Sequence, residues 1–342
     1  MLSKKYINDG KPFLILNQLQ QQVKREVEEK IKNGVYIFEK TRCPICENFS
    51  DFDTLFKKDK FGLECNVAAC KKCGLLMINP RMTQNAYNDF YDKEYRRLYF
   101  GKEATEDNLD IDFEQKTPRG INIFEFIKEK ANIKEFNNQY VVEIGCCSGA
   151  NLKPFKEAGA QITGLDLDTK YLNYGKIHKA LDLNYGSISD FKFEKSPDII
   201  IYSHVLEHIL DLDKELKRIK EISKASTYIY IEVPGILNFL NRHNDKTYIM
   251  SIGIAHTFYF SLNSLKYLFE KYGFELVYGD EFVRALFRRS ERDIQYDINN
   301  LYVVHNNYLK NIERIIFFRK TKILKQKIKN KIRKILWKTK KL

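Results

Sequence analysis

The second half of the chain alternates short apolar runs with segments whose apolar residues recur every three or four positions. The runs "YVVEIG", "QITGLDLD", "PDIIIYS" and "STYIYIEVP" are typical of buried strands, and segments such as "DKELKRIKEIS" between them are typical of amphipathic helices. A further helix and strand are predicted over "SLNSLKYLFEKYGFELVYGD". Because strands that alternate with helices usually pair in parallel, the pattern predicts an α/β fold with a mainly parallel, doubly wound sheet.

The first 120 residues do not show this alternation. Residues 1–42 hold one helical pattern, "LNQLQQQVKREVEEKIKNG", and residues 43–80 are rich in cysteines and turns. In 81–120, the aromatic stretch "NDFYDKEYRRLYFG" precedes an acidic segment that we expect to be a loop. The predicted order is therefore a helical segment, a small cysteine-containing domain, an aromatic linker, the α/β domain over 121–300 and a tail.

Composition limits where the protein works. The 342 residues, 44% of them hydrophobic, are enough to bury a large core. Apolar runs fall short of the roughly 18 residues that a membrane span needs, and "MLSKKYINDG" lacks the apolar core of a secretory signal. We therefore expect a cytoplasmic protein. Residues 310–342 contain 14 Lys and Arg but one acidic residue, so this tail carries the whole net charge of +13.

The basic tail combines its charge with an apolar stripe at near-helical spacing, which predicts an amphipathic helix over 310–342. The stripe consists of Ile316, Leu324, Ile328, Ile332, Ile335 and Leu336, with Trp337 beside it. Such a helix can lie at an anionic membrane surface, here the inner face of the membrane, with about 1 kcal/mol of attraction per basic residue. Two other interpretations stay open: an RNA-binding segment and a solvated extension.

Two CxxC pairs, "CPIC" and "CKKC", predict a metal centre. Cysteine pairs outside a secretory context favour thiolate metal binding over disulfides. Cys43, Cys46, Cys70 and Cys73 provide the four thiolates of a tetrahedral structural Zn²⁺ site, which leaves no open catalytic position. Cys65 is a spare cysteine that can replace one of these ligands.

The segment "VVEIGCCSGANL" has the form of a cofactor loop after the first strand. Gly145 and Gly149 fit a tight turn, and Asp166 ends the second strand, where it can accept hydrogen bonds from both ribose hydroxyls. A dinucleotide site would need glycine at Cys147 to admit a pyrophosphate. Glu143 would repel a phosphate but can bind an ammonium group. This combination suits S-adenosylmethionine (SAM).

Four ordered segments, "VVEIGCCSGANL", "ITGLDLD", "PDIIIYSHVLEHILD" and "YIYIEVPG", resemble class I SAM-dependent methyltransferases over residues 139–290. The resemblance implies a Rossmann-like fold and a SAM site. It implies the following cofactor-binding residues: Glu143, Gly145, Cys147, Gly149, Asp166, Leu167, Ser187, Ile188 and Ser203. Together with the cysteine pairs and "CGLLMINPRMTQNAYNDFYDKEYRRLY", the chain also resembles bacterial methyltransferases with an amino-terminal zinc ribbon, many of which modify surface polysaccharides.

Other residues of the predicted site carry alternative interpretations. Cys146 and Cys147 resemble small residues tolerated beside the cofactor, and a reactive thiol is the alternative. Tyr91, Tyr95 and Tyr99 can cover the substrate cleft or simply pack two domains together.

Methyl transfer from a sulfonium depends mainly on alignment, but a poor nucleophile such as a sugar hydroxyl needs a base. His204 and His208 in "SHVLEHILD" and His256 in "AHTFYFS" are the candidates, with structural hydrogen bonding as the alternative. Small-RNA end-methylating enzymes bind a metal through an ExxEH pattern, so a second metal on these histidines and Glu207 is a further hypothesis.

We therefore predict a SAM-dependent methyltransferase that acts on a sugar hydroxyl in glycan or surface-polysaccharide synthesis, with an acceptor that can be lipid-linked. The alternatives are carbon methylation of a nucleotide sugar, RNA methylation and SAM binding without catalysis. Nucleic acid is the less favoured partner, because residues 1–309 carry no net charge.

Overall fold

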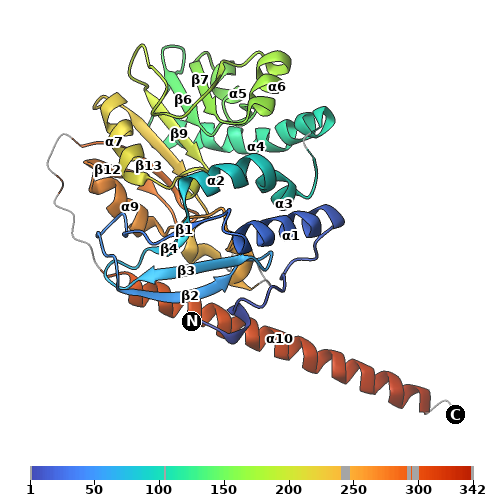
Figure 1. The fold of residues 1–342 in the computed structure, drawn as a ribbon. Coiled ribbons are helices and arrows are strands. Elements are labelled where there is room, and N and C mark those ends of the chain that lie inside the picture. Colours follow the sequence, from blue (N-terminus) through green and yellow to red (C-terminus); the bar gives the residue numbers. More distant parts are fainter. Residues whose placement is uncertain (1, 104, 240–246, 291–293, 295–299, 340–342) are drawn as a thin grey trace.

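A seven-stranded sheet forms the centre of the protein (Figure 1). The structure is a computed structural model that describes all residues except 1, 104, 240–246, 291–293, 295–299 and 340–342. After residue 319 it describes the backbone but few side chains.

The sheet has the strand order β12-β13-β10-β9-β6-β7-β8. Its strands are β6 (Tyr140–Ile144), β7 (Gln161–Asp166), β8 (Leu183–Tyr185), β9 (Ile199–Ser203), β10 (Tyr228–Glu232), β12 (Phe274–Gly279) and β13 (Arg284–Arg289). The pairs from β10 to β8 are parallel, and β13 runs antiparallel to both of its neighbours. This confirms the predicted α/β class, whereas β8 and β13 were not predicted.

Helices cover both faces of the sheet because alternate strand residues point to opposite sides. On β6, Val142 faces one core and Val141 the other. The first core contains α7 (Leu212–Ile222) and α9 (Leu262–Glu270), and the second contains α4 (Glu106–Lys130), α5 (Lys153–Glu157) and α6 (Thr169–Lys179). The first core continues into the cysteine domain, so the two domains share one apolar interior.

The cysteine domain is built on a second sheet of order β11-β4-β3-β2. Its strands are β2 (Phe52–Lys58), β3 (Glu64–Cys70), β4 (Leu76–Ile78) and β11 (Phe258–Tyr259), while β1 (Phe38–Glu39) pairs separately with β5 (Arg81–Met82). Strand β11 comes from the loop that follows β10 and pairs antiparallel with β4. The crossover between β10 and α9 therefore ties the two sheets together.

The remaining amino-terminal segments are helical. They are the short turn η1 (Lys4–Tyr6), α1 (Gln18–Lys32), α2 (Gln84–Phe90), the π-helix η2 (Tyr91–Tyr95) and α3 (Arg96–Phe100). The acidic segment after residue 101 corrects the sequence prediction. It is not a loop but the first half of α4, which Thr105 caps and which continues through Pro118. Leu109 and Phe113 are buried in the second core, where Phe113 packs on Tyr174 of α6, and that tertiary contact outweighs the proline.

The carboxyl-terminal helix α10 spans Tyr302–Thr339 and begins earlier than the predicted start at residue 310. Its first turns pack on the second sheet through Leu309, Ile312 and Ile316. Ile316 is therefore part of the core and not of a free apolar stripe. The side chains of the other predicted stripe residues lie outside the described part of the chain. Past the second sheet, the helix extends away from the body (Figure 1).

Candidate active site

The predicted cofactor loop follows β6 and contacts the end of β7. Gly145 has φ +67°, and a Cβ at this position would lie 2.4 Å from a methyl group of Val205. Cys147 also adopts a left-handed conformation, with φ +51°. Its amide donates a 2.7 Å hydrogen bond to one carboxylate oxygen of Asp166, and the amide of Asp168 donates to the other. These two amides fix the carboxylate of Asp166 beside the cofactor loop.

Glu143 points its carboxylate into the protein beside this loop. It is 1% exposed, and Asn151 donates a 2.7 Å hydrogen bond to one of its oxygens. The other oxygen is buried and has no hydrogen-bond partner among the described residues. Burial raises the pKa of Glu143 to about 8. A buried carboxylate with one free oxygen fits the ammonium group of an amino acid, as predicted for SAM.

The other predicted cofactor residues take varied positions. Leu167 is 65% exposed directly after Asp166. Ile188 is fully buried in the core, and Ser203 donates to Glu232 over 3.2 Å. The hydroxyl of Ser187 donates a 2.6 Å hydrogen bond to Asp190, an acid that the sequence analysis did not include.

The two loop cysteines have different environments. Cys146 is buried against Gly164, where a Cβ would lie 2.6 Å from its sulfur. Burial raises the pKa of the Cys146 thiol well above its usual value, so this thiol is protonated and unreactive. Cys147 is only partly buried, and its backbone serves the loop through Asp166. This geometry agrees with small residues tolerated beside a cofactor.

A second constellation lies directly after β9, in the turn η3 (Leu206–His208) and the crossover to α9. One potential ligand atom from each of Glu207, His208 and His256 lies within 4.8 Å of the others. Both oxygens of Glu207 are buried and lack hydrogen-bond partners among the described residues. Val205, which precedes this group, packs on Gly145. The turn therefore adjoins the cofactor loop.

The ring of His208 has a defined orientation. Its Nδ1 lies 2.9 Å from the carbonyl oxygen of Ala255 and 2.6 Å from the hydroxyl of Tyr91. Because a carbonyl oxygen only accepts, Nδ1 carries a hydrogen, and the basic nitrogen of the neutral ring is Nε2. Nε2 lies 3.8 Å from a Glu207 oxygen. Burial lowers the pKa of His208.

His204 and His256 differ in charge at neutral pH. His204 lies between two acids, with Nδ1 3.5 Å from Glu207 and Nε2 3.7 Å from Glu232. Burial opposes its charge, but these carboxylates raise the pKa of His204 to about 9, so it is a cation. Burial and the neighbouring His208 lower the pKa of His256 to about 3, so its ring is neutral at pH 7. His204 also lies outside the group of potential metal ligands.

Four tyrosines from the amino-terminal part of the chain pack over the cluster of Glu207, His208 and His256. Tyr87, Tyr91, Tyr95 and Tyr99 lie four positions apart, with successive ring centroids 4.8, 4.3 and 4.7 Å apart. Tyr91 contacts His208, and the Tyr99 hydroxyl accepts a 3.2 Å hydrogen bond from the Ala255 amide. The tyrosines therefore pack the two domains together, and Tyr91 and Tyr95 contact the ring of His208. The sequence analysis did not include Tyr87, whose hydroxyl donates to the Ala255 carbonyl.

A cavity of about 180 Å³ is lined in part by His256. Its walls come from both sheets: Lys60 follows β2, Pro234 and Gly235 follow β10, and Tyr259 is on β11. Pro234 and Gly235 lie at the carboxyl end of the central sheet, where α/β proteins bind ligands. The cavity is thus placed to receive an acceptor next to His256.

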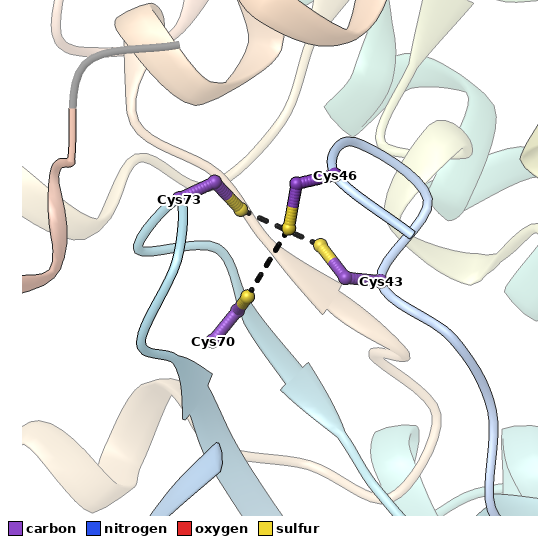
Figure 2. Close-up of side chains that lie close together, drawn as sticks. All are labelled: Cys43, Cys46, Cys70 and Cys73. Atoms are coloured by element: carbon purple, nitrogen blue, oxygen red, sulfur yellow. Dashed lines mark hydrogen bonds between the residues drawn. The ribbon is translucent and has the colours of Figure 1, made fainter. Parts of the chain in front are cut away.

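The four predicted zinc ligands converge, although they come from two separate turns (Figure 2). The sulfurs of Cys43 and Cys73 are 3.4 Å apart, as are those of Cys46 and Cys70. A tetrahedral zinc–thiolate shell, with Zn–S bonds of about 2.3 Å, has sulfurs about 3.8 Å apart, so the cluster fits this ion. Cys65 is buried in another apolar cluster and is not a spare ligand.

Comparison with known proteins agrees with this site. Residues 114–278 match the family model described as a methyltransferase domain. Residues 114–278 are thus similar to methyltransferase domains, and the order of the strands in the central sheet agrees with this match. The matched segment includes both the cofactor loop and the Glu207–His208 turn.

The curated relatives are similar over part of their length. A ubiquinone biosynthesis O-methyltransferase of Pelagibacter ubique is 26% identical over 32% of this chain and 48% of its own. One from Chelativorans sp. is 26% identical over 47% and 62%. The chain thus spans about half the length of these relatives. A solved SAM-dependent methyltransferase from Methanosarcina mazei is 14% identical, covers 46% of this chain and 94% of its own, and has a TM-score of 0.37.

Proposed function

We propose that this protein transfers a methyl group from SAM to a sugar hydroxyl in glycan or surface-polysaccharide synthesis. The main support for this proposal is that the turn after β9 connects the proposed SAM site to the proposed acceptor cavity. The cofactor loop contacts Val205, and the turn that follows leads to His208, whose ring packs against that of His256 in the wall of a separate cavity. The names of the curated relatives, which specify O-methylation, support an oxygen acceptor.

The residues of the chain have distinct roles in this reaction. When bound, SAM supplies a methyl group activated by its positively charged sulfur. Asp166 binds the ribose and Glu143 the ammonium group. The neutral ring of His256 takes the proton of the acceptor hydroxyl. The ring of His208, which the Ala255 carbonyl orients, packs against the ring of His256. Cationic His204 stabilises the carboxylate of Glu207.

A direct assay tests the proposed activity. The protein is incubated with isotopically labelled SAM and, separately, with nucleotide sugars, a lipid-linked sugar and RNA. We expect label in a sugar, with an O-methyl linkage by NMR. A C-methyl product would favour the nucleotide-sugar alternative, and label in RNA alone would overturn the proposal. Binding of SAM without any transfer would favour the non-catalytic alternative.

We also propose that Cys43, Cys46, Cys70 and Cys73 bind one structural Zn²⁺. Four thiolates fill its tetrahedral shell, so the ion has no open position for chemistry. Lys271 links the first cysteine turn to α9 by donating a 2.9 Å hydrogen bond to the Pro44 carbonyl.

We further propose that α10 anchors the protein peripherally to the inner face of the membrane. Among the described residues, no helix combines the length and apolar character needed to cross a bilayer. The exposed rings of Phe317 and Phe318 and the following lysines instead suit an interfacial helix. A truncation after residue 320 preserves the packed turns, so flotation with anionic and neutral vesicles can compare it with the full chain. Binding of the full chain to RNA but not to anionic vesicles would contradict the anchor.

A further inference from the structure

Lys60 is placed in the candidate acceptor cavity by the hairpin of the cysteine domain. It follows β2, and its amide donates a 3.2 Å hydrogen bond to the Ile252 carbonyl in the crossover. Its ammonium group lies 4.7 Å from the ring centroid of Tyr99 and 5.3 Å from that of Phe61. Lys60 and His256 both line the cavity, so a single small acceptor can contact both.

This lysine has no anionic partner in the described part of the chain. Lys58, two positions earlier, forms a close ion pair with Asp9, and Lys30 lies 2.7 Å from both Asp89 and Glu94. No carboxylate lies within 4.0 Å of the Lys60 ammonium among the described residues. Its aromatic neighbours offer cation–π contact alone.

The adjacent acid, Asp59, attracts the charge of Lys60 but forms no direct ion pair with it. The fully buried carboxylate of Asp59 accepts hydrogen bonds from the amides of Phe61, Leu63 and Ile254. Removal of a cation from water is unfavourable unless an anion compensates, and burial lowers the pKa of Lys60 accordingly. An anion that enters the cavity would supply the missing partner.

We propose that Lys60 binds an oxyanion of the acceptor, a phosphoryl or carboxylate group, and thereby selects anionic sugars over neutral ones. The inference rests on the proposed function and narrows its substrate class. Lys60 is a positioning residue: it holds the charged group of the sugar so that a nearby hydroxyl faces His256. The cysteine domain then contributes to specificity as well as to stability.

The test measures the binding of three probes, glucose 1-phosphate, glucuronate and glucose, by calorimetry on the full-length protein. The two anionic probes distinguish a phosphoryl from a carboxylate ligand. We expect at least one anionic probe to bind about tenfold or more tightly than glucose, the size expected for a charged hydrogen bond. Lys60→Met should remove this preference and Lys60→Arg should keep most of it. Lys57→Met, at an exposed lysine of the same hairpin, is the matched control and should bind as the wild type does.

Two results would overturn the proposal: equal binding of all three probes by the wild type, or an unchanged anion preference in Lys60→Met. A purely structural lysine would lower the melting temperature without altering the ratio of anionic to neutral affinity, so both are measured. SAM affinity is measured on the same samples. If the wild type does not bind SAM, the proposed function is contradicted. If it binds SAM but shows no preference for anionic probes, only the proposed role of Lys60 is contradicted.

Discussion

The cofactor half and the acceptor half of the candidate site are assembled in different ways. The cofactor half uses Glu143, Gly145 and Asp166, which belong to two adjacent strands and the turn between them. The acceptor half collects Lys60 from the cysteine domain and His256 from the crossover. The proposed donor site thus needs only a local turn, whereas the cavity that we propose for the acceptor takes its walls from both domains. Changes in the cysteine domain should therefore affect the two halves unequally.

The largest effect is expected from loss of the metal. Cys70→Ser should remove zinc and destabilise the protein, because zinc binding contributes on the order of 10 kcal/mol in small metal domains. In any protein that stays folded, methyl transfer should fall more than SAM affinity. Metal analysis and thermal unfolding are the measurements, with Cys65→Ala on the same strand as the control. Equal zinc content in Cys70→Ser and the wild type would contradict the prediction.

Removal of the candidate base should impair the acceptor half of the site and leave the cofactor half intact. His256→Ala should lower the maximal rate by about 10²–10⁴, the usual contribution of a general base, and leave SAM affinity nearly intact. Kinetics and calorimetry check the two parts. His178→Gln, at an exposed histidine of α6, should retain full activity. If His256→Ala keeps the wild-type rate, His208→Ala is the next variant to test.

A change at the end of β7 should instead impair the cofactor half of the site. Asp166→Asn should weaken SAM binding by about a hundredfold, because a charged acceptor for two ribose hydroxyls is lost. Calorimetry measures this change. Asp182→Asn, which alters an acid beside β8 at the level of Thr163, is the matched control. Unchanged SAM affinity in Asp166→Asn would remove the ribose assignment.

The boundary between the halves can be probed by pH. An ordinary histidine has a pKa of about 6.5, and that of His204 is raised to about 9 in the folded protein. Its ion pairs therefore contribute fully below pH 6.5, and their contribution is lost as pH rises through 9. His204→Gln should reduce the free energy of unfolding by about 2–3 kcal/mol at pH 6 and much less at pH 10. Denaturant unfolding at the two pH values measures both; an equal reduction at each would show that charge is not the cause.

The smallest effect concerns the ammonium site. Glu143, with its pKa near 8, is mostly protonated at pH 7, and the ammonium of SAM would favour its ionised form. SAM binding at pH 7 should therefore release close to one proton, and affinity should rise by roughly fiftyfold between pH 6 and 8. Calorimetry in buffers of different ionisation enthalpy counts the protons. Glu143→Gln should abolish the release, and proton uptake by the wild type would refute the assignment.

The sequence by itself determined the α/β alternation, the cofactor loop and the four-cysteine cluster. These features depend on contacts close along the chain or on residue types with few uses. Strand periodicity placed β6, β7, β9 and β10, and glycines at Gly145 and Gly149 marked a turn with positive φ. The two CxxC pairs likewise predicted that their four cysteines lie together, because such pairs have few other uses. Local physics alone was sufficient for each of them.

Only the tertiary structure decided how the acceptor half is built. The two residues of β11 are too few for a periodic signal, and they form a strand because β4 offers its edge. The first half of α4 is helical despite its polar sequence and Pro118, because Leu109 and Phe113 are buried in the core beside α6. No local pattern marked Lys60. Its importance arises from long-range packing, which places its ammonium group beside aromatic rings and leaves it without an ion-pair partner among the described residues.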